Sequence, residues 1–516
     1  MRKIAISIIM AAAMPVAVMG QGYENPVIPG FHPDPSACAV GEKFYLVNSS
    51  FQYFPGVPIY ESDDMAHWRQ IGNVLDRESQ LPLKGTSSWL GIYAPTIRYN
   101  KGVFYMITTN VPAGGNFLVT ATDPAGPWSE PVMLSQGGID PSLYFEDGDC
   151  YMVSNPNGIT LCKIDPETGE QLTESKVIWN GTGGRYPEGP HIYKKDGYYY
   201  LLISEGGTEL AHSLTIARSE DIWGPYTPNP KNPILTHCRM AAQDNQIQAT
   251  GHGDLVQAGD GSWWIVFLAY RNFGGSYHHL GRETYLAPVE WNEGEWPVVN
   301  GNNPVMLSME DVDLPSEGTD YKGRYVNTAA EGFSSMGPEW VYIQNPDSSK
   351  YELEGNGMRL YCSESSISGN ERPTFLGRRQ ESPNITVTAS ADVSRLESGD
   401  EAGLTVYQIN NGHIDIGVRR LGDGSLEAVR RVTVKSLVRE DVLSHPTGDE
   451  VMLRIESDGN NYVMSISEDG EEFVKAYPIE CSLVSTEVVG GFTGVTLGMY
   501  ATGSGSAYFD YFDYKE

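Results

Sequence analysis

Three carboxyl side chains stand in short, similar motifs in the first half of the chain. Asp34 lies in FHPDPS (31–36), Asp140 in IDPS (139–142) and Glu188 in PEGPH (187–191). Carboxyl groups held close together push their pKa values apart, so that one can act as an acid and another as a base. A single Asp-Pro-Ser is most simply interpreted as a turn. Three carboxyls at matching places favour one shared site.

Each motif is followed by an apolar run that contains a Gly and a pair of large residues, and two further copies complete the set. A Pro lies nine residues before the first large residue in four copies: Pro35 before Phe44, Pro95 before Phe104, Pro141 before Cys150, and Pro190 before Tyr199. Asp254 has the same place before Trp263. Five β repeats at intervals of 46 to 64 residues are typical of a propeller. Because equivalent segments of the blades converge on the axis, we expect the three carboxyls to meet there, with Glu188 one residue early.

The pattern predicts an all-β protein with two domains. We expect a five-bladed β-propeller at residues 21–305 and a linker rich in Gly, Asn, Ser and acidic residues at 306–337. Short strands separated by turns then predict a β-sandwich, jelly-roll-like, at 338–516. Cys150 and Cys162 could pair across a hairpin, but a buried free thiol is favoured because Cys150 fills a large-residue position of the repeat.

The net charge and the N-terminal sequence indicate which binding partners and which cell compartment to expect. The net charge of −31 over 516 residues argues against a nucleic-acid partner or an anionic membrane surface. Arg2, Lys3, an apolar run at 4–19 and a small-residue cleavage site predict a signal peptide at 1–20. A membrane anchor is the alternative, but the run is short for a span. We therefore expect an exported, soluble protein in the periplasm.

The motifs together resemble glycoside hydrolase family 43. The resemblance is carried by FHPDPS (31–36), SSFQYFPGVPI (49–59), GIDPS (138–142), EGPH (188–191), TGHGD (250–254) and LGRET (280–284). In the second half, PTFLGRRQ (373–380) and EAGLTV (401–406) are similar to the C-terminal sandwich of the β-xylosidase and arabinofuranosidase branch. The resemblance extends over essentially the whole mature chain.

The resemblance implies a propeller with its active site at the axis and hydrolysis of glycosidic bonds with inversion. An inverting mechanism needs a base that activates water and an acid that protonates the leaving oxygen. The matching motifs assign the general base to Asp34 and the general acid to Glu188. Asp140 would raise the pKa of Glu188 and orient it.

Four further residues match sugar-binding positions of the family: Phe51, Tyr93, His252 and Arg282. Core packing is the alternative for Phe51 and Tyr93, and a structural salt bridge is the alternative for Arg282. His252 stands where Glu188 stands in its own repeat, so it should face the axis. In some relatives this His contacts a buried calcium, so a structural calcium stays open, although no cofactor is expected to be required.

These observations lead us to expect an exo-glycosidase that releases non-reducing-end α-L-arabinofuranosyl residues from plant hemicellulose, with xyloglucan or arabinoxylan as the polymer. The alternative is a β-D-xylosidase or a dual activity, because the two sugars present similar hydroxyls. Tyr93 replaces a Trp common in xylosidases, and this favours arabinofuranose. A non-catalytic carbohydrate-binding protein is disfavoured, because Asp34, Asp140 and Glu188 are all present.

Overall fold

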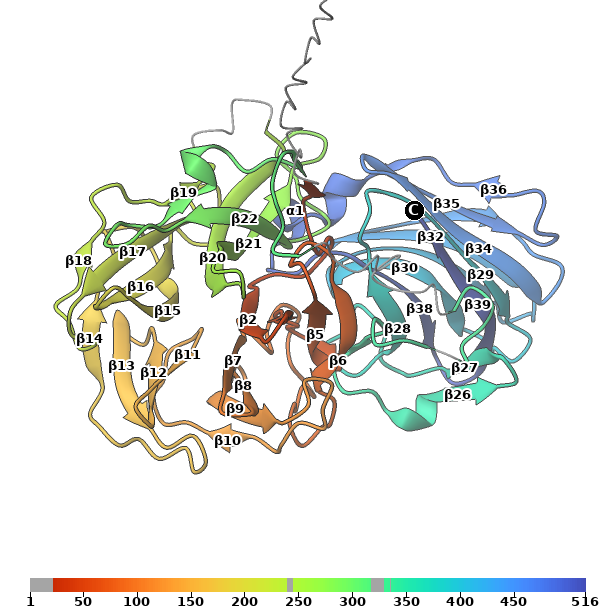
Figure 1. Cartoon of the computed structure of the whole chain (residues 1–516). Helices are drawn as coiled ribbons and strands as arrows, with labels where there is room; N and C mark the ends of the chain where they lie inside the picture. The colour runs from red at the N-terminus through yellow and green to blue at the C-terminus, as the bar shows by residue number, and fades with distance from the viewer. Residues whose placement is uncertain (1–21, 239–244, 317–328, 335) are drawn as a thin grey trace, which may run out of the picture.

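The computed structural model describes residues 22–238, 245–316, 329–334 and 336–516. They form a ring of β-sheets, joined side by side to a two-sheet sandwich (Figure 1). The expected five-bladed propeller and C-terminal sandwich are therefore confirmed. The one α-helix of the described residues, α1 (Thr486–Val489), is a single turn. The predicted signal peptide lies outside the described residues.

Five antiparallel sheets form the propeller; four of them have four strands, and that of blade IV has five. Blade I contains β2 (Ser36–Val40), β3 (Lys43–Val47), β5 (Gly56–Ser62) and β6 (Arg69–Leu75). Blade II contains β7 (Thr96–Asn100), β8 (Val103–Asn110), β9 (Gly115–Ala121) and β10 (Val132–Met133). Blade III contains β11 (Ser142–Glu146), β12 (Asp149–Ser154), β13 (Ile159–Ile164) and β14 (Lys176–Trp179). Blade IV contains β15 (Glu188–Lys195), β16 (Tyr198–Glu205), β17 (Ser213–Ser219) and β18 (Thr227–Pro228), with β19 (Leu235–Thr236) also on β17. Blade V contains β20 (Ile247–Gln257), β21 (Trp263–Arg271), β22 (Glu283–Glu290) and β23 (Val298–Val299).

Tight turns set the register between the first two strands of a blade. Lys101-Gly102, Asp147-Gly148 and Asp196-Gly197 have positive φ at both residues, as a type I′ hairpin turn requires. Because turn type and loop length fix the pairing of a hairpin, the large residues of each repeat occupy equivalent places. The motif Pro falls directly before the innermost strand in blades I to III, whereas Pro190 lies inside β15 in blade IV.

The ring closes where β2 contacts β20 of blade V as well as β7 of blade II. Beside this closure β1 (Tyr23–Glu24) pairs with β24 (Ser308–Met309), and Ile28 bridges to Thr284. Ser308 and Met309 thus lie on the propeller although the sequence placed them in the linker. At the other end of that stretch, Phe333 is buried in the core of the sandwich. Residues 317–328 and 335 of the expected linker lie outside the described residues.

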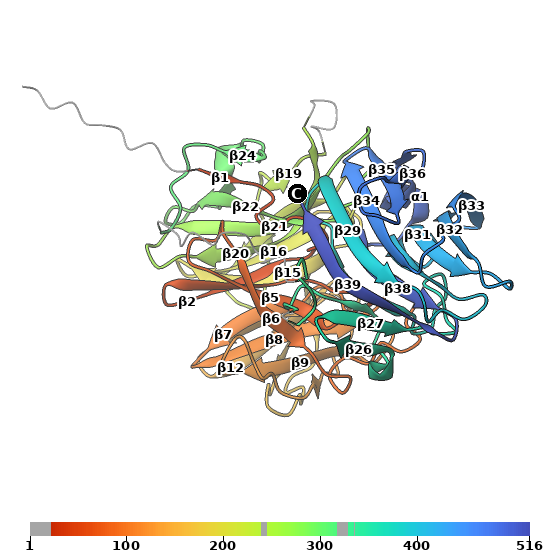
Figure 2. The ribbon, with the colours of Figure 1, turned by 90° about the vertical axis from the view of Figure 1, so that its right-hand side faces the viewer.

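The sandwich consists of two antiparallel sheets whose apolar faces pack on each other (Figure 2). The larger sheet contains, in spatial order, β26 (Tyr351–Glu354), β27 (Gly357–Tyr361), β39 (Ser506–Lys515), β29 (Asn384–Asp392), β34 (Glu450–Asp458), β35 (Asn461–Ser467) and β36 (Val474–Lys475), with β37 (Ile479–Glu480) also on β35. The smaller contains β28 (Thr374–Arg379), β38 (Thr496–Thr502), β30 (Glu401–Ile409), β31 (Gly412–Arg420), β32 (Leu426–Val434) and β33 (Leu437–Ser444).

An aromatic cluster joins the two domains. β4 (Tyr53–Phe54) of the propeller pairs with β25 (Tyr342–Ile343), which leads into the sandwich. Phe31, Phe51 and Tyr53 share one buried cluster with sandwich residues that include Phe375 and Tyr407. The blade that carries Asp34 is therefore fixed to the sandwich by apolar packing.

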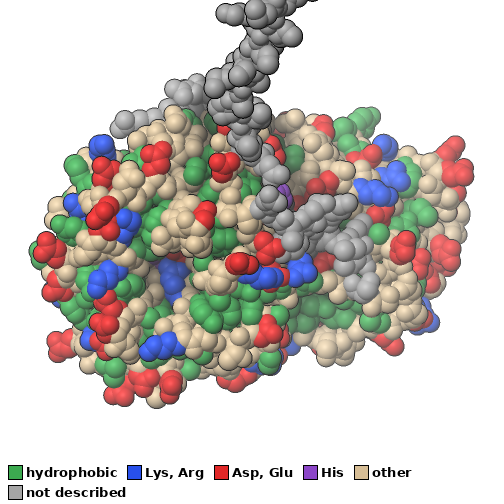
Figure 3. Space-filling model, in the orientation of Figure 1, with side chains coloured by type: hydrophobic (Ala, Val, Ile, Leu, Met, Phe, Trp, Pro, Cys, Tyr) green, Lys and Arg blue, Asp and Glu red, His purple; other side chains and the backbone are tan. Residues whose placement is uncertain are grey.

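Acidic residues outnumber basic ones in the sequence, and the surface reflects this excess. Acidic side chains are spread over both domains on the face seen in Figure 3, and Lys and Arg occur there in small groups. All six cysteines are free, and Cys150 and Cys162 are buried. Among the described residues no helix has the length and apolar character needed to cross a membrane.

Candidate active site

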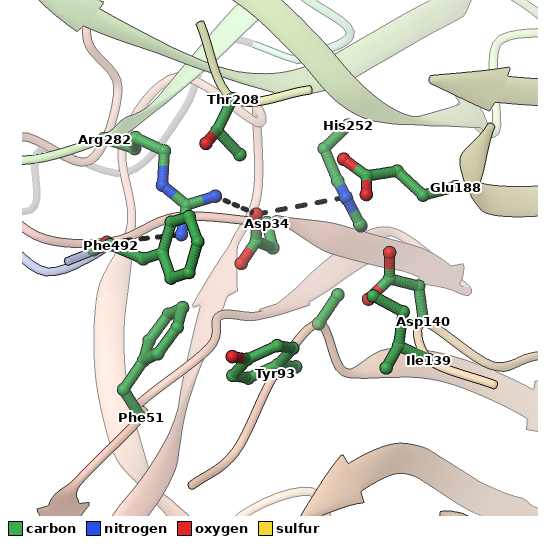
Figure 4. Close-up of a pocket in the computed structure, with 11 residues that line it drawn as sticks. Asp34, Phe51, Tyr93, Ile139, Asp140, Glu188, Thr208, His252, Arg282 and Phe492 are labelled. Atoms are coloured by element: carbon green, nitrogen blue, oxygen red, sulfur yellow. Dashed lines mark hydrogen bonds and ion pairs between the residues drawn. The ribbon is translucent and has the colours of Figure 1, made fainter. Parts of the chain in front are cut away.

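A pocket lies at the propeller axis, and its walls come from every blade and from the sandwich (Figure 4). Its lining residues are Asp34, Phe51, Tyr93, Ala94, Ile139, Asp140, Glu188, Thr208, His252, Arg282 and Phe492. The cavity measures about 110 Å³. All seven residues that the sequence singled out line this one pocket.

The repeat register explains why these residues meet. Asp34 and Asp140 lie two residues before β2 and β11, with φ of 54° and 52°. Gly189 holds that same backbone position in blade IV, with φ of 58°. A Cβ atom at Gly189 would lie 3.0 Å from the His252 ring, so a side chain there would require this ring to shift. The carboxyl group of this repeat is instead supplied by Glu188, one residue earlier.

Asp34 is held as a carboxylate. Arg282 Nη1 donates to Asp34 Oδ1 at 2.8 Å, and Ser49 Oγ donates to Oδ2 at 2.6 Å. His252 Nδ1 lies 3.9 Å from Oδ1. Burial alone would raise the pKa of Asp34, but Arg282, His252 and the Ser49 hydrogen bond outweigh it and hold the pKa below its ordinary value. The carboxylate is thus ionised and well placed to accept a proton.

Glu188 and Asp140 have raised pKa values, in contrast to Asp34. Burial and then the Asp34 carboxylate raise the pKa of Glu188 to about 7, against the lowering effect of Arg282. Burial, followed by Glu188 and Asp34, raises the pKa of Asp140 well above its ordinary value, although the Gly189 backbone N–H donates to it. Because the repulsion is mutual, ionisation of either carboxyl group disfavours ionisation of the other. The pair can therefore hold a proton near neutral pH.

A buried carboxylate fixes the loop that precedes Glu188. Glu205, at the end of β16, accepts from the backbone N–H groups of Thr182 and Gly184, each at 2.9 Å. It also accepts from the hydroxyl of Thr215 at 2.7 Å. Since every donor comes from a neighbouring segment of blade IV, Glu205 ties the entry to β15 to the rest of the blade.

Aromatic rings form the wall opposite Glu188 and Asp140 (Figure 4). Phe51 lies 5.2 Å from Tyr93 and 6.4 Å from Phe492, centroid to centroid. The Arg282 guanidinium lies over the Phe51 ring at 5.6 Å, and its Nη2 donates to the Phe492 carbonyl at 3.3 Å. The alternatives left open by the sequence coexist here: Phe51 packs in the core and Arg282 forms a salt bridge, yet both face the pocket.

Sequence reasoning missed four lining residues. Ile139 stands two residues before its motif Pro, as Tyr93 and Glu188 do, and Ala94 stands one before, as Asp34 does. The repeat offset could have found these two. Thr208 and Phe492 lie outside the repeat and gave no sequence signal.

A buried polar network lies on the innermost strands of several blades. Arg98 Nη1 donates to Asp254 Oδ2 at 2.7 Å, and Arg98 Nη2 donates to His191 Nδ1 at 2.9 Å. Tyr193 and Ser36 donate their hydroxyls to Asp254, each at 2.6 Å. Burial would raise the pKa of Asp254, but Arg98 and the other partners lower it to about 2. This network connects the inner strands that carry the pocket residues.

The residues near His252 do not fit a calcium site. Calcium takes six to eight oxygen ligands. The acidic oxygens of Asp34, one of which lies 3.9 Å from His252 Nδ1, bind Arg282 and Ser49, and Asp254 binds Arg98 and its hydroxyl donors. Within the described ranges no group of three or more His, Cys, Asp or Glu is arranged to hold a metal.

Two family descriptions match the chain. Glycosyl hydrolases family 43 matches residues 23–297, and the beta xylosidase C-terminal Concanavalin A-like domain matches residues 331–515. These segments coincide with the propeller and the sandwich.

Characterised relatives match over nearly their full length. A non-reducing end alpha-L-arabinofuranosidase of Bacteroides ovatus is 40% identical over 97% of this chain and 96% of its own. A xylosidase/arabinosidase of Butyrivibrio fibrisolvens is 40% identical over 95% of this chain and 98% of its own. Among solved structures, the Bacteroides ovatus xyloglucan PUL GH43B superimposes with a TM-score of 0.89 at 39% identity, covering 96% of this chain and all of the other. A xylan beta-1,4-xylosidase of Bacillus halodurans gives 0.87 at 32% identity, with 96% and 100% covered.

Proposed function

The chain belongs to glycoside hydrolase family 43, and on this basis we propose that it is an inverting exo-glycosidase that releases non-reducing-end α-L-arabinofuranosyl residues from hemicellulose side chains. The observation that carries the proposal is the pairing of an ionised Asp34 with a protonatable Glu188 in a pocket of about 110 Å³. Such a pocket accepts one terminal sugar and suits hydrolysis at a chain end.

The proposed reaction divides two proton transfers between two carboxyl groups. Asp34 accepts a proton from a water molecule while that water attacks the anomeric carbon. Glu188 donates its proton to the departing glycosidic oxygen as the bond breaks. Asp140 lies beside Glu188, and their mutual repulsion keeps a proton on the pair until transfer. Arg282 and Ser49 hold the Asp34 carboxylate in position.

The same pocket offers contacts for the sugar itself. Arg282 has donors suited to vicinal hydroxyls, and Tyr93 and Thr208 add hydroxyl groups to the lining. Phe51 and Phe492 provide apolar surface for the ring carbons. His252 lies between the base and the acid (Figure 4) and can contact the bound ring.

A β-D-xylosidase, or an enzyme with both activities, is the second candidate. It is favoured by the similarity to the Butyrivibrio xylosidase/arabinosidase and to the Bacillus xylosidase structure. Arabinofuranose is favoured by Tyr93 and by the similarity to the Bacteroides arabinofuranosidase. The similarity to a structure named for xyloglucan supports xyloglucan as the polymer, with arabinoxylan as the alternative.

The test is a comparison of rates on 4-nitrophenyl α-L-arabinofuranoside and 4-nitrophenyl β-D-xylopyranoside. We expect a clear preference for the arabinofuranoside, and NMR of the first product should show inverted anomeric configuration. A preference for the xyloside would establish the second candidate. If the enzyme cleaved neither of these substrates and no natural arabinosylated oligosaccharide, the proposal would be overturned.

We also propose that the chain is exported to the periplasm, on the strength of Arg2, Lys3 and the apolar run at 4–19. N-terminal sequencing of the protein from the native cells should find a mature start near Gln21. Recovery of the full chain from the cytoplasmic fraction would contradict export.

A further inference from the structure

His212 is a buried histidine behind the catalytic pocket, just before β17. Its Nε2 lies 4.0 Å from Glu188 Oε1. That nitrogen is fully buried and has no hydrogen-bond partner among the described residues. Since an unpaired buried polar atom is costly, its orientation toward Glu188 needs an explanation.

The tautomer of His212 follows from its other nitrogen. Nδ1 lies 3.2 Å from the backbone carbonyl of Ala249. A carbonyl only accepts, so Nδ1 carries the hydrogen. Burial, followed by the neighbouring His252, lowers the pKa of His212 to about 3. The ring is therefore neutral at working pH, and Nε2 presents a lone pair toward Glu188.

The backbone of β20 is shaped around this ring. Ala249 has φ of 53°, a left-handed conformation that non-glycine residues rarely adopt. A Cβ atom at position 251 would lie 2.2 to 2.4 Å from three atoms of the His212 ring, so only glycine fits there. Both features keep the imidazole in one position beside the acid.

The other groups that face Glu188 differ from His212 in charge or in their partners. Asp34 and Asp140 are acidic neighbours of Glu188, and Arg282 has only donors and is bound to Asp34. His252 directs its Nδ1 toward Asp34. His212 offers Glu188 a neutral nitrogen that is fully buried and has no hydrogen-bond partner among the described residues.

We propose that His212 is a positioning residue for the general acid: its Nε2 accepts the hydroxyl of protonated Glu188 and holds the proton there until the leaving oxygen takes it. A small rotation of the Glu188 side chain closes the 4.0 Å gap. A hydrogen bond to the protonated form favours that form, so His212 keeps Glu188 protonated. This inference rests on the proposed role of Glu188.

Two substitutions separate this role from a structural one. His212→Asn places an amide where Nδ1 lies, so it keeps the Ala249 contact and loses the acceptor for Glu188. His212→Gln places an amide oxygen near the position of Nε2 and loses the Ala249 contact. If His212 acts through Glu188, the Gln variant keeps more acid catalysis than the Asn variant. If His212 acts only through its contact with the Ala249 carbonyl, the Asn variant should instead keep more acid catalysis than the Gln variant.

The readouts are the pH profile of kcat/KM and its dependence on the leaving group. For His212→Asn we expect a basic limb shifted to lower pH and about a tenfold loss on an unactivated oligosaccharide. On the 4-nitrophenyl glycoside, whose leaving group needs little protonation, the loss should be under about threefold.

His237 provides a matched control. Its Nδ1 lies 3.0 Å from the Ile247 carbonyl, and its Nε2 accepts from the Val305 backbone N–H at 3.2 Å; it does not line the pocket. His237→Asn should leave the pH profile and the leaving-group dependence unchanged. The proposal would be overturned if both His212 variants kept the wild-type pH profile and leaving-group dependence. It would also be overturned if the Asn variant kept more acid catalysis than the Gln variant. Failure of the proposed function itself would appear differently, as inactivity of the unmodified enzyme on every glycoside.

Discussion

Two carboxyl groups in one pocket are shifted in opposite directions by their neighbours. Asp34 receives hydrogen bonds from Arg282 and Ser49, which favour its charge. Glu188 receives no such donor in the described structure; burial and the Asp34 charge favour its protonated form. The division of labour between base and acid thus follows from the donors that surround each residue.

This division predicts different kinetic losses for two isosteric variants. Glu188→Gln should lose about 10²–10⁴-fold in kcat on an unactivated oligosaccharide and much less on the 4-nitrophenyl glycoside. Asp34→Asn should lose about 10²–10⁴-fold on both, because both substrates need an activated water. Steady-state kinetics on the two substrates tests this. Exposed Glu167→Gln is the control, and equal leaving-group dependence in both variants would refute the assigned roles.

The pKa shifts also predict the pH dependence of kcat/KM. Glu188 must be protonated to act as an acid, so kcat/KM should fall about tenfold per pH unit above about 7. Asp34 must be ionised, and its lowered pKa keeps it so in mild acid. We expect a plateau from weakly acidic pH to near 7, measured with buffers of constant ionic strength. A rate that rises through pH 8 would contradict the assignment of Glu188.

At the scale of elements, a left-handed residue at or just before the start of an inner strand orients the catalytic side chain. Asp34, Asp140 and Gly189 share this conformation at φ of 52° to 58°. The conformation turns the chain at the axis so that the preceding loop faces the pocket and the following residues enter the strand. At Gly189 an added side chain would also press on the His252 ring.

Gly189→Ala should therefore reduce activity more than stability. The left-handed backbone costs about 1 kcal/mol for alanine, and the added Cβ meets the His252 ring at 3.0 Å. We expect at least about a tenfold fall in kcat/KM, from displacement of Glu188 and His252. Gly197→Ala is the matched control, since Gly197 has φ of 80° in the same blade but open space around its Cβ position. If Gly189→Ala and Gly197→Ala had similar melting temperatures and equal kcat/KM, this account would be contradicted.

At the scale of the whole molecule, the sandwich completes the active site. Phe492 reaches from the second domain to the pocket, where it contacts Phe51, Tyr93 and Trp89. The buried cluster between the domains holds this arrangement in place. The propeller supplies the reacting groups, and the sandwich narrows the space around them.

Phe492→Ala should weaken substrate binding without changing the chemistry. Loss of one aromatic wall is worth about 0.5–1.5 kcal/mol, so KM should rise about twofold to twelvefold while the pH profile is preserved. The control is Tyr477→Ala, an aromatic of the same domain that is 88% exposed. An unchanged KM in the Phe492 variant would show that the sandwich does not shape the sugar site.

The sequence by itself determined the repeat, and through it the propeller and the convergence of Asp34, Asp140, Glu188 and His252. A regular offset was sufficient, because hairpin register transmits sequence spacing directly into position at the axis. Phe492, Thr208 and His212 could not be predicted in this way. Their segments follow no repeat, and their place beside the pocket depends on packing between blades and domains. The direction of each pKa shift was likewise decided by the tertiary structure, because burial and the donors around a carboxyl group come from segments far apart in the chain.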